Sequence, residues 1–289
     1  MGKTLLCDGH NLAFRSFYGI KELNRSDGFP TNMIHGWLRT FWKLEDSFKP
    51  DSIHVFFDLD GSKRRERLLP TYKENRGLPP DGFCEQLELV KVLSKALGYG
   101  TYEQSGLEAD DLIASAVKIF DQEENEVIIV SADKDLAQLI SPRVVQLLPP
   151  PTANPKLGWR TLDENGVKEK FGVSPNAILD YLSIIGDQSD NIPGLSGVGP
   201  KTASKWLEEY GDLDNLILNA GRIKPKRFCS LVYEKRDILK LNKQLVKLDS
   251  DVNLNLKDNS SPDINNLEKI LIELEMKKSL EEANNRYVK

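Results

Sequence analysis

Four short apolar runs constrain the fold of this chain more than any other feature of its sequence. They span residues 3–7 (KTLLC), 52–57 (SIHVFF), 126–131 (EVIIVS) and 144–148 (VVQLL). Most are rich in β-branched or aromatic residues, which is typical of buried strands. Helical patterns occur at about 33–48, 83–98 and 107–120. Because strands alternate with helices, the sequence predicts an α/β fold with a mostly parallel sheet.

The second half of the chain has a different pattern. The proline-rich segment 148–155 cannot form a regular element, because proline lacks an N–H donor and restricts the residue before it. Strand signals then fade, and a helix is predicted to begin at residues 174–175 (Ser-Pro). A final amphipathic helix is predicted at about 263–283. We therefore predict two parts, residues 1–160 and 161–289.

The composition excludes several classes of protein. A chain of 289 residues with 39% hydrophobic and 8% aromatic residues can bury a sizeable core. Its first apolar stretch ends after three residues, and no later run approaches the roughly 18 apolar residues of a membrane span, so we expect neither a signal peptide nor a membrane helix. The three cysteines are far apart and odd in number, which favours reduced thiols in a cytoplasmic setting over disulfides or zinc.

Acidic residues follow three of the predicted strands at the point where each strand ends. Asp8 ends the first run, Asp58 ends the second, and Asp133 and Asp135 closely follow the third. The carboxyl ends of parallel strands meet at one edge of a sheet, where α/β proteins keep their sites. We therefore expect these carboxylates to lie close together.

Five further acids extend this group. Glu108, Asp110 and Asp111 open the third predicted helix, where Glu108 and Asp111 share a face. Asp187 and Asp190 lie in the sequence GDQSDN. Each acid taken singly has an ordinary alternative, because carboxylates stabilise helix starts and aspartate is a common turn residue. Nine such residues together are harder to explain in that way.

Nine converging carboxylates repel each other unless cations neutralise them. Hard divalent cations take oxygen ligands, and carboxylate ligation suits Mg²⁺ or Mn²⁺. Zinc is disfavoured because His10, His35 and His54 show no zinc-binding spacing. The net charge of −5 ordinarily argues against a nucleic-acid partner, but without the nine acids the rest of the chain is net positive. Two such ions can assist hydrolysis of a phosphodiester, so we expect a polyanionic substrate.

Basic residues are concentrated in the segment 63–76 (KRRERLLPTYKENR). It contains six Lys and Arg side chains against two acids, soon after Asp58. A solvated helix face explains the charges alone. At the mouth of a metal site, however, such a segment can hold a phosphate backbone and stack a base on Tyr72.

A glycine-rich segment at 194–202 (GLSGVGPKT) does not match a nucleotide-binding loop. It fails as a Walker A motif because Pro200 precedes the lysine and no predicted strand precedes the segment, and it lacks the last glycine of GxGxxG. It instead predicts a hairpin between two helices, the second of which begins at Pro200 and presents N–H groups to a DNA phosphate. The candidate DNA-binding residues here are Gly197, Gly199, Lys201, Thr202 and Lys205.

Six motifs together resemble one known family. They are CDGHNLAFRSF (7–17), VFFD (55–58), LLPTYKENR (68–76), GLEADDLIAS (106–115), SADKDLAQLI (131–140) and GDQSDNIPGLSGVGPKTASKWL (186–207). In this order they are similar to the 5′-nuclease or flap endonuclease superfamily, above all to the N-terminal nuclease domain of bacterial DNA polymerase I and to bacteriophage 5′-nucleases. The resemblance covers nearly the whole chain.

The resemblance implies a PIN-like core in residues 1–160, a helical arch at about 62–82, and a helix-hairpin-helix-type motif at about 175–210 that binds duplex DNA with help from K⁺. Two or more Mg²⁺ or Mn²⁺ ions would bind to Asp8, Asp58, Glu108, Asp110, Asp111, Asp133, Asp135, Asp187 and Asp190. Lys73 and Arg76 would contact the scissile phosphate, and Arg65 would be a further basic contact of the arch. The implied activity is that of a structure-specific 5′-3′ exonuclease and flap endonuclease.

Two other functions stay open at this point. A module that binds branched DNA without cutting shares the motifs, but here the acid set is complete. An RNA-cutting PIN-type nuclease shares the sheet-edge acids, but the hairpin at 194–202 favours duplex DNA. The expected partner is branched or flapped DNA, bound by a monomer in the cytoplasm at the nucleoid, with no membrane. No polymerase sequence follows Lys289, which fits either a free-standing nuclease or a part of a longer protein.

Overall fold

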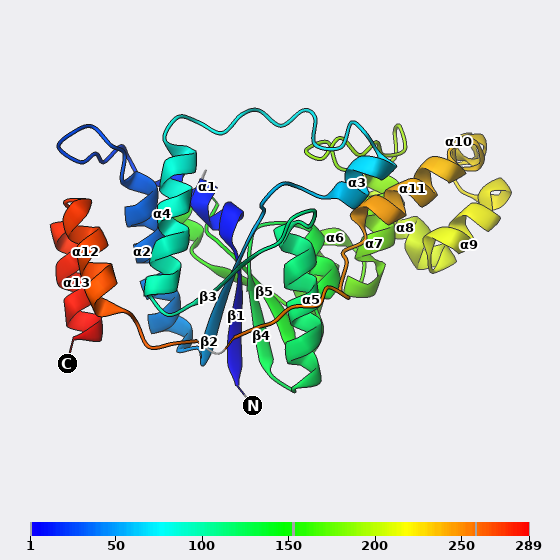
Figure 1. Cartoon of the computed structure of the whole chain (residues 1–289). Coiled ribbons are helices and arrows are strands. Elements are labelled where there is room, and N and C mark those ends of the chain that lie inside the picture. Colours follow the sequence, from blue (N-terminus) through cyan, green and yellow to red (C-terminus); the bar gives the residue numbers. More distant parts are fainter. Residues whose placement is uncertain (1, 152–153, 258, 289) are drawn as a thin grey trace.

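A six-stranded sheet runs through the larger part of the molecule (Figure 1). The computed structural model describes residues 2–151, 154–257 and 259–288. The strands are β1 (Lys3–Asp8), β2 (Ser52–Phe57), β3 (Gly100–Glu103), β4 (Glu126–Val130), β5 (Val144–Leu148) and β6 (Arg160–Leu162), in the spatial order β3-β2-β1-β4-β5-β6. The first five are parallel and β6 is antiparallel, so the predicted fold class is confirmed. The sequence patterns missed β3 and β6, because both are short edge strands without an apolar run; β3 is mostly half-buried and β6 mostly exposed.

The sheet is buried on both faces because side chains alternate along its central strands. On β1, Leu5 and Cys7 pack against the layer formed by α1 (Gly9–Gly19), α2 (Asn32–Phe48) and α4 (Phe83–Ala96). Leu6, between them, packs on the opposite side, which α5 (Ala109–Gln122) covers. The helices predicted at 33–48, 83–98 and 107–120 are thus confirmed as α2, α4 and α5.

Helix α1 begins directly where β1 ends. The Asp8 carboxylate caps the helix by accepting a hydrogen bond of 3.0 Å from the Asn11 N–H. Gly9 is required because a Cβ at this position would lie 2.5 Å from the Phe57 ring. This close packing holds Asp8 at the carboxyl edge of the sheet.

The segment between β2 and α4 forms an arch (residues 62–82) that spans from the helix layer to the helical part of the molecule (Figure 1). Its first part is the helix α3 (Lys63–Leu68), which the Ser62 hydroxyl caps. The helix ends before Pro70, since proline disfavours the helical conformation in the residue that precedes it. Turns follow at 70–75, and 76–80 has no regular structure. The predicted helical arch is therefore helical only in α3.

A second group of helices has a hydrophobic core of its own. These helices are α6 (Glu164–Phe171), α7 (Ile178–Ile185), α8 (Pro200–Tyr210), α9 (Leu213–Leu218), α10 (Cys229–Glu234) and α11 (Arg236–Val246). The 3-10 turns of the chain are η1 (Asp135–Leu139), η2 (Pro155–Leu157), η3 (Pro175–Ala177), η4 (Ala220–Arg222) and η5 (Lys226–Phe228). Leu182 of α7, Trp206 of α8 and Leu239 of α11 are buried in this core. The helix predicted from Pro200 is confirmed as α8.

The last two helices return to the first part of the molecule (Figure 1). Helices α12 (Ile264–Glu273) and α13 (Lys277–Tyr287) stand where one helix was predicted. Their buried residues Leu267, Leu271 and Ala283 belong to the same core as α2 and α4. The prediction of one helical part at 161–289 is therefore wrong, because the apolar stripe of α12 covers α4 and because β6 extends the sheet to residue 162. Within the described ranges, the helices lack the length and apolarity needed to span a membrane.

Candidate active site

Four acids from four different elements form a cluster at the carboxyl edge of the sheet, here called the sheet-edge group (Asp8, Asp58, Asp110 and Asp133). Asp8 ends β1, Asp58 follows β2, Asp133 follows β4, and Asp110 lies in the first turn of α5. The Ser131 hydroxyl donates to Asp8 Oδ2 at 2.7 Å and accepts from the Asp133 N–H at 3.0 Å. The parallel register of β1, β2 and β4 thus brings together acids far apart in the sequence, as predicted.

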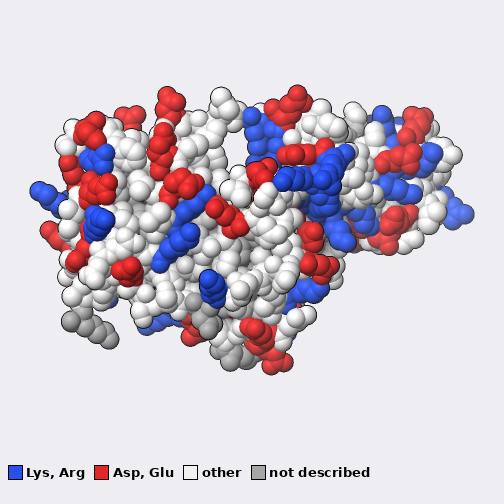
Figure 2. Space-filling model, in the orientation of Figure 1, with Lys and Arg blue, Asp and Glu red and all other residues white. Residues whose placement is uncertain are grey.

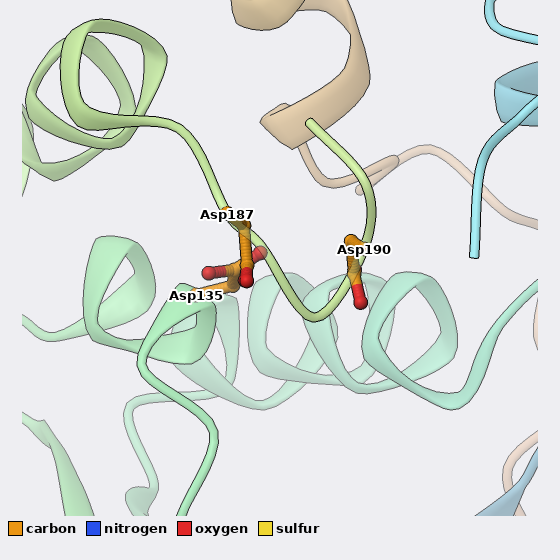
Figure 3. A group of neighbouring side chains, drawn as sticks. All are labelled: Asp135, Asp187 and Asp190. Carbon is orange, nitrogen blue, oxygen red and sulfur yellow. The ribbon is translucent and has the colours of Figure 1, made fainter. Parts of the chain in front are cut away.

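Three further acids form the loop group (Asp135, Asp187 and Asp190; Figure 3). Asp135 opens η1, while Asp187 and Asp190 lie in the loop between α7 and α8. Each offers an oxygen atom, and these atoms lie within 4.8 Å of one another. Asp135 Oδ1 is buried and has no hydrogen-bond partner among the described residues.

The carboxyl groups of the site destabilise one another's charged forms. Burial, together with the charges of Asp58 and Asp133, raises the pKa of Asp8 to about 7. Burial and the charges of Asp133, Asp8 and Asp58 raise the pKa of Asp110 well above its ordinary value. The pKa of Asp133 is raised by burial, and that of Asp135 by burial and by the charge of Asp133. In these four acids, burial and mutual repulsion outweigh the nearby positive charges of Lys73 and Lys134.

This set of donors fits hard divalent cations. All the ligating atoms are carboxylate oxygens, which Mg²⁺, Mn²⁺ and Ca²⁺ prefer over the nitrogen and sulfur ligands typical of zinc. A cation placed between the groups favours the ionised carboxylates that burial and mutual repulsion disfavour. The buried Asp135 Oδ1 is available as a ligand atom.

Asp111 lies in a different environment from the other predicted ligands. Its two carboxylate oxygens accept hydrogen bonds of 2.6 and 2.8 Å from the Arg65 guanidinium, and the Asp249 N–H adds a bond of 2.9 Å. Burial raises the pKa of Asp111, but the hydrogen bonds and charge of Arg65 outweigh it and hold the pKa below its ordinary value. In this structure the Asp111 carboxylate therefore pairs with Arg65 and belongs to neither the sheet-edge group nor the loop group.

Arg65 is buried rather than presented to DNA. Its side chain is 3% exposed and donates to Glu108 Oε2 at 3.0 Å as well as to Asp111. It also donates to the backbone carbonyls of Leu245 and Lys247 at the end of α11, at 2.8 and 3.2 Å. The prediction that Arg65 contacts DNA is therefore wrong for this structure, because every donor direction of the guanidinium faces protein.

Tyr72 is also buried, at 9% exposure, and packs in the core of the second helix group. Its hydroxyl lies 3.0 Å from Glu108 Oε2 and 3.1 Å from Asp190 Oδ2, so it bridges two of the acids. The prediction that Tyr72 stacks on a base is corrected, because its ring packs in this core and the Lys73 Nζ lies over it, 5.0 Å from the ring centroid.

The cations of the arch reach the acids. Lys73 Nζ lies 2.5 Å from Glu108 Oε1 and 3.9 Å from Asp190 Oδ2, and Arg76 lies 2.5 Å from Asp190 Oδ1. Burial lowers the pKa of Lys73, but the charges of Glu108 and Asp190 outweigh it, so the pKa is raised and the ammonium stays charged. Figure 2 shows further basic side chains gathered where α3 and α11 lie in Figure 1.

The hairpin between α7 and α8 has the geometry that its glycines predict. Gly199 is the N-cap of α8, Pro200 is its first residue, and Gly197 has a positive φ of 74°. Lys201 and Lys205 are exposed on the first turns of α8 and form no ion pair within the described ranges. Thr202 lies between them and is half-buried. The N-terminus of α8 is thus open to an anion.

Two family models together match most of the chain. The model of the 5′-3′ exonuclease N-terminal resolvase-like domain matches residues 3–172, and the model of the 5′-3′ exonuclease C-terminal SAM fold matches residues 173–268. The chain belongs to the 5′-3′ exonuclease family. The boundary between the two matches lies twelve residues after the one predicted from the sequence, beyond β6.

Several known proteins are similar to nearly the whole chain. A 5′-3′ exonuclease of Aquifex aeolicus is 37% identical, across 98% of this chain and 96% of the relative. The thermostable DNA polymerase I of Thermus thermophilus is 36% identical across 97% of this chain, which spans 33% of the polymerase. A structure of the bacteriophage T5 flap endonuclease shares the fold, with a TM-score of 0.73 at 21% identity across 98% of both chains.

Sequence reasoning on this 5′-3′ exonuclease missed several polar residues at the site. Lys134 pairs with Asp187 at 3.0 Å, and Ser131 links Asp8 to the loop that follows β4. Both lie within the SADKD motif. Their position close to Asp133 and Asp135 in the sequence was the signal that could have identified them. His10 also contacts the site, since its Nδ1 accepts a hydrogen bond of 3.1 Å from the Asp58 N–H.

Proposed function

We propose that this chain is a structure-specific 5′-nuclease that hydrolyses DNA phosphodiesters, acting as a 5′-3′ exonuclease and flap endonuclease. The observation that carries the proposal is the convergence of the sheet-edge group and the loop group below an arch whose Lys73 and Arg76 reach the same acids. Family membership supports it. So do structures of similar fold with DNA, namely the bacteriophage T5 flap endonuclease and the catalytic core of Rad2.

Mg²⁺ or Mn²⁺ is the proposed cofactor, with at least two ions. The sheet-edge group would hold one site and the loop group another, with Glu108 at the border between them beside Lys73. When bound, such ions polarise the phosphate and lower the pKa of a water molecule that attacks it. Asp111 stays out of this set and supports it by fixing Arg65, which in turn holds Glu108.

Lys73 and Arg76 are the proposed catalytic residues of the arch. In this structure their side chains are bound to Glu108 and Asp190. Once cations neutralise those carboxylates, the ammonium and the guanidinium are free to bind the scissile phosphate and stabilise the charge that grows on it in the transition state. The arch thus places the Lys73 and Arg76 side chains beside the acid cluster.

The hairpin at 194–199 and the start of α8 are the proposed grip on a DNA duplex. The residues concerned are Gly197, Gly199, Lys201, Thr202 and Lys205. They present backbone N–H groups and the exposed Lys201 and Lys205, which bind phosphates without reading sequence. A K⁺ ion between the hairpin and the phosphate is part of this proposal. These two exposed lysines of α8 support the duplex part of it.

A second basic surface supports branched rather than plain duplex DNA as the partner. Arg15 of α1, Arg39 and Lys43 of α2, and Trp159 line a groove whose lining contains no carboxylate. None of these three cations has an ion-pair partner in residues 2–151, 154–257 or 259–288. Figure 1 shows α2 and α8 on opposite sides of the sheet. Two arms of a branched substrate could therefore be held at once.

We further propose that the protein acts as a monomer in the cytoplasm, at the nucleoid and away from membranes. The thiols of Cys7, Cys84 and Cys229 are free, which supports a reducing compartment. The fold already supplies both acid groups and the arch from one chain, so the site needs no second copy.

Cleavage of a labelled 5′-flap DNA with and without Mg²⁺ tests the proposed function. We expect release of the flap that EDTA abolishes. Binding without any cleavage in Mg²⁺ or Mn²⁺ would identify a non-cutting DNA-structure-binding module. Preferential cutting of an RNA flap of the same shape would identify an RNA nuclease instead.

Replacement of Lys73 by alanine is expected to slow the chemical step more than it weakens binding. Loss of a cation at the scissile phosphate should lower the single-turnover rate at saturating flap DNA about 100-fold, because transition-state charge loses its partner. Lys63→Ala is the matched control, since Lys63 lies in the same arch but pairs with Asp60 and not with the acid cluster. An unchanged rate with weakened binding would make Lys73 a backbone contact only.

Replacement of Lys201 by alanine is expected to have the opposite effect. Its loss should weaken binding to every duplex sequence alike and lower the slope of log affinity against log salt by about 1, while the single-turnover rate at saturation hardly changes. The measurement is DNA binding across a salt series in Ca²⁺. Lys95→Ala, an exposed lysine on α4, should leave the slope intact. A Lys201→Ala slope equal to that of the parent would remove the α8 grip from the proposal.

A further inference from the structure

Two fully buried amide side chains contact the two loops that carry the loop group. Gln146 lies on β5 and Asn242 lies on α11, and both are 0% exposed. Both amides donate to backbone carbonyls, and among the described residues neither bonds to an acid side chain. Asn242 bonds to carbonyls on either side of Asp187 and Asp190, and Gln146 bonds to those of Ser131 and Asp133, which precede Asp135.

Gln146 fixes the loop that leaves β4. Its Nε2 donates to the carbonyl of Ser131 at 2.9 Å and to that of Asp133 at 2.6 Å. The loop also has an internal hydrogen bond, in which Asp133 Oδ1 accepts from the Asp135 N–H at 2.8 Å. The position of Asp135, and of Asp133 beside it, therefore depends on an amide that projects from the neighbouring strand.

Asn242 fixes the loop that follows α7. Its Nδ2 donates to the carbonyl of Ser183 at 3.0 Å and to that of Pro193 at 2.7 Å. These two carbonyls flank the segment 184–192, which carries Asp187 and Asp190, so one amide closes the loop at both ends. Pro193 also directly precedes the hairpin at 194–199 that leads to α8.

We propose that Gln146 and Asn242 are positioning residues that hold the two loops at the separation at which the loop group binds a divalent cation. The inference rests on the proposed function and names the groups that set the geometry of its second metal site. Carbonyl oxygens only accept hydrogen bonds, so the NH₂ end of each amide must face the loop. An apolar isostere would keep the packing and remove both bonds, so that one buried and one partly buried carbonyl lose this donor and the loop is free to shift.

The test measures Mn²⁺ alone, by electron paramagnetic resonance titration of the free protein. We expect Gln146→Met and Asn242→Leu each to weaken Mn²⁺ binding about 10- to 100-fold, the range typical when an outer support of a metal ligand is removed. Cleavage by either variant should recover toward the parent rate at saturating Mn²⁺, because the acids themselves are intact. Far-UV circular dichroism establishes that each variant is folded before titration.

Gln86→Met is the matched control. Gln86 is also a fully buried glutamine, and its amide bonds to Asn32, Met33 and Gly82 in the α2–α4 layer, away from the acids. The same chemical change there should lower the melting temperature and leave Mn²⁺ affinity unchanged. Parent-like Mn²⁺ affinity in folded Gln146→Met and Asn242→Leu, or an equal loss in Gln86→Met, would overturn the inference.

A further readout separates the two amides and separates this inference from the proposed function. Asn242→Leu should also weaken duplex binding in EDTA, since its bond to Pro193 holds the hairpin, whereas Gln146→Met should not. Equal duplex binding by the two variants would contradict the assigned contacts. If the parent itself failed to bind Mn²⁺ or to cleave, the proposed function would fail; if the parent succeeded and the variants matched it, only the amide inference would fail.

Discussion

Replacement of Asp133 and Asp135 together by asparagine is expected to lower the single-turnover rate of Mg²⁺-dependent 5′-flap cleavage by about 1,000-fold or more. Asp133 belongs to the sheet-edge group and its charge acts on Asp135 of the loop group, so the double change removes ligands from both proposed metal sites. Duplex binding in EDTA should stay nearly intact, because the lost groups hold ions and not DNA. Single-turnover cleavage and equilibrium binding are the two measurements.

The stability of the same variant gives a second readout. Mg²⁺ should raise the melting temperature of the parent, since a ligand that binds only the native state stabilises it, and this increase should disappear in the double variant. Asp81→Asn combined with Asp237→Asn changes the charge equally at two exposed positions and should preserve cleavage and the Mg²⁺ effect. Substantial Mg²⁺-dependent cutting by Asp133→Asn/Asp135→Asn would remove these residues from the site.

Replacement of Arg65 by methionine is expected to lower the free energy of unfolding by about 3–5 kcal/mol, the usual effect of removing one partner from a buried ion pair. The Asp111 side chain, 1% exposed, would lose the Arg65 cation that pairs with it, and Glu108 and two carbonyls at the end of α11 would each lose a hydrogen bond. Urea denaturation followed by circular dichroism measures the change.

Two comparisons make this prediction specific. Arg67 lies two residues further along α3 and is exposed, so Arg67→Met should change the unfolding free energy by no more than about 0.5 kcal/mol. Arg65→Met combined with Asp111→Leu should recover part of the loss, because the unpaired buried carboxylate is then gone. A cost for Arg65→Met no larger than that for Arg67→Met would show that Arg65 is an exposed DNA contact after all.

The sequence predicted the sheet and the acids at its edge because both depend on local signals. Buried strands such as β1 and β4 are short apolar runs, and the acid that follows each one is adjacent in sequence. Parallel pairing then brings Asp8, Asp58 and Asp133 together without further information. The hairpin before α8 was equally predictable from the sequence, since Gly199 and Pro200 have strong conformational preferences.

The errors concern residues whose environment is set by distant parts of the chain. Arg65 and Tyr72 lie in a basic segment that looks solvent-exposed, yet α11 and the loop after α7 cover them from more than one hundred residues away. Asp111 follows Asp110 directly, but neighbouring residues point about 100° apart around a helix axis, so the two face different partners. The apolar stripe of helix α12 predicts that the helix packs against another element, but it does not identify α4 as that element.

The C-terminal helix pair has a consequence for how the protein is made. Residues 264–287 cover a surface built by α2 and α4, which a ribosome completes nearly two hundred residues earlier. During translation the sheet and both acid groups can assemble while the apolar side of α4 is still open to water, and such surfaces are where nascent chains associate wrongly or recruit chaperones. The synthesis of α12 and α13, rather than the formation of the sheet, therefore closes this part of the hydrophobic core.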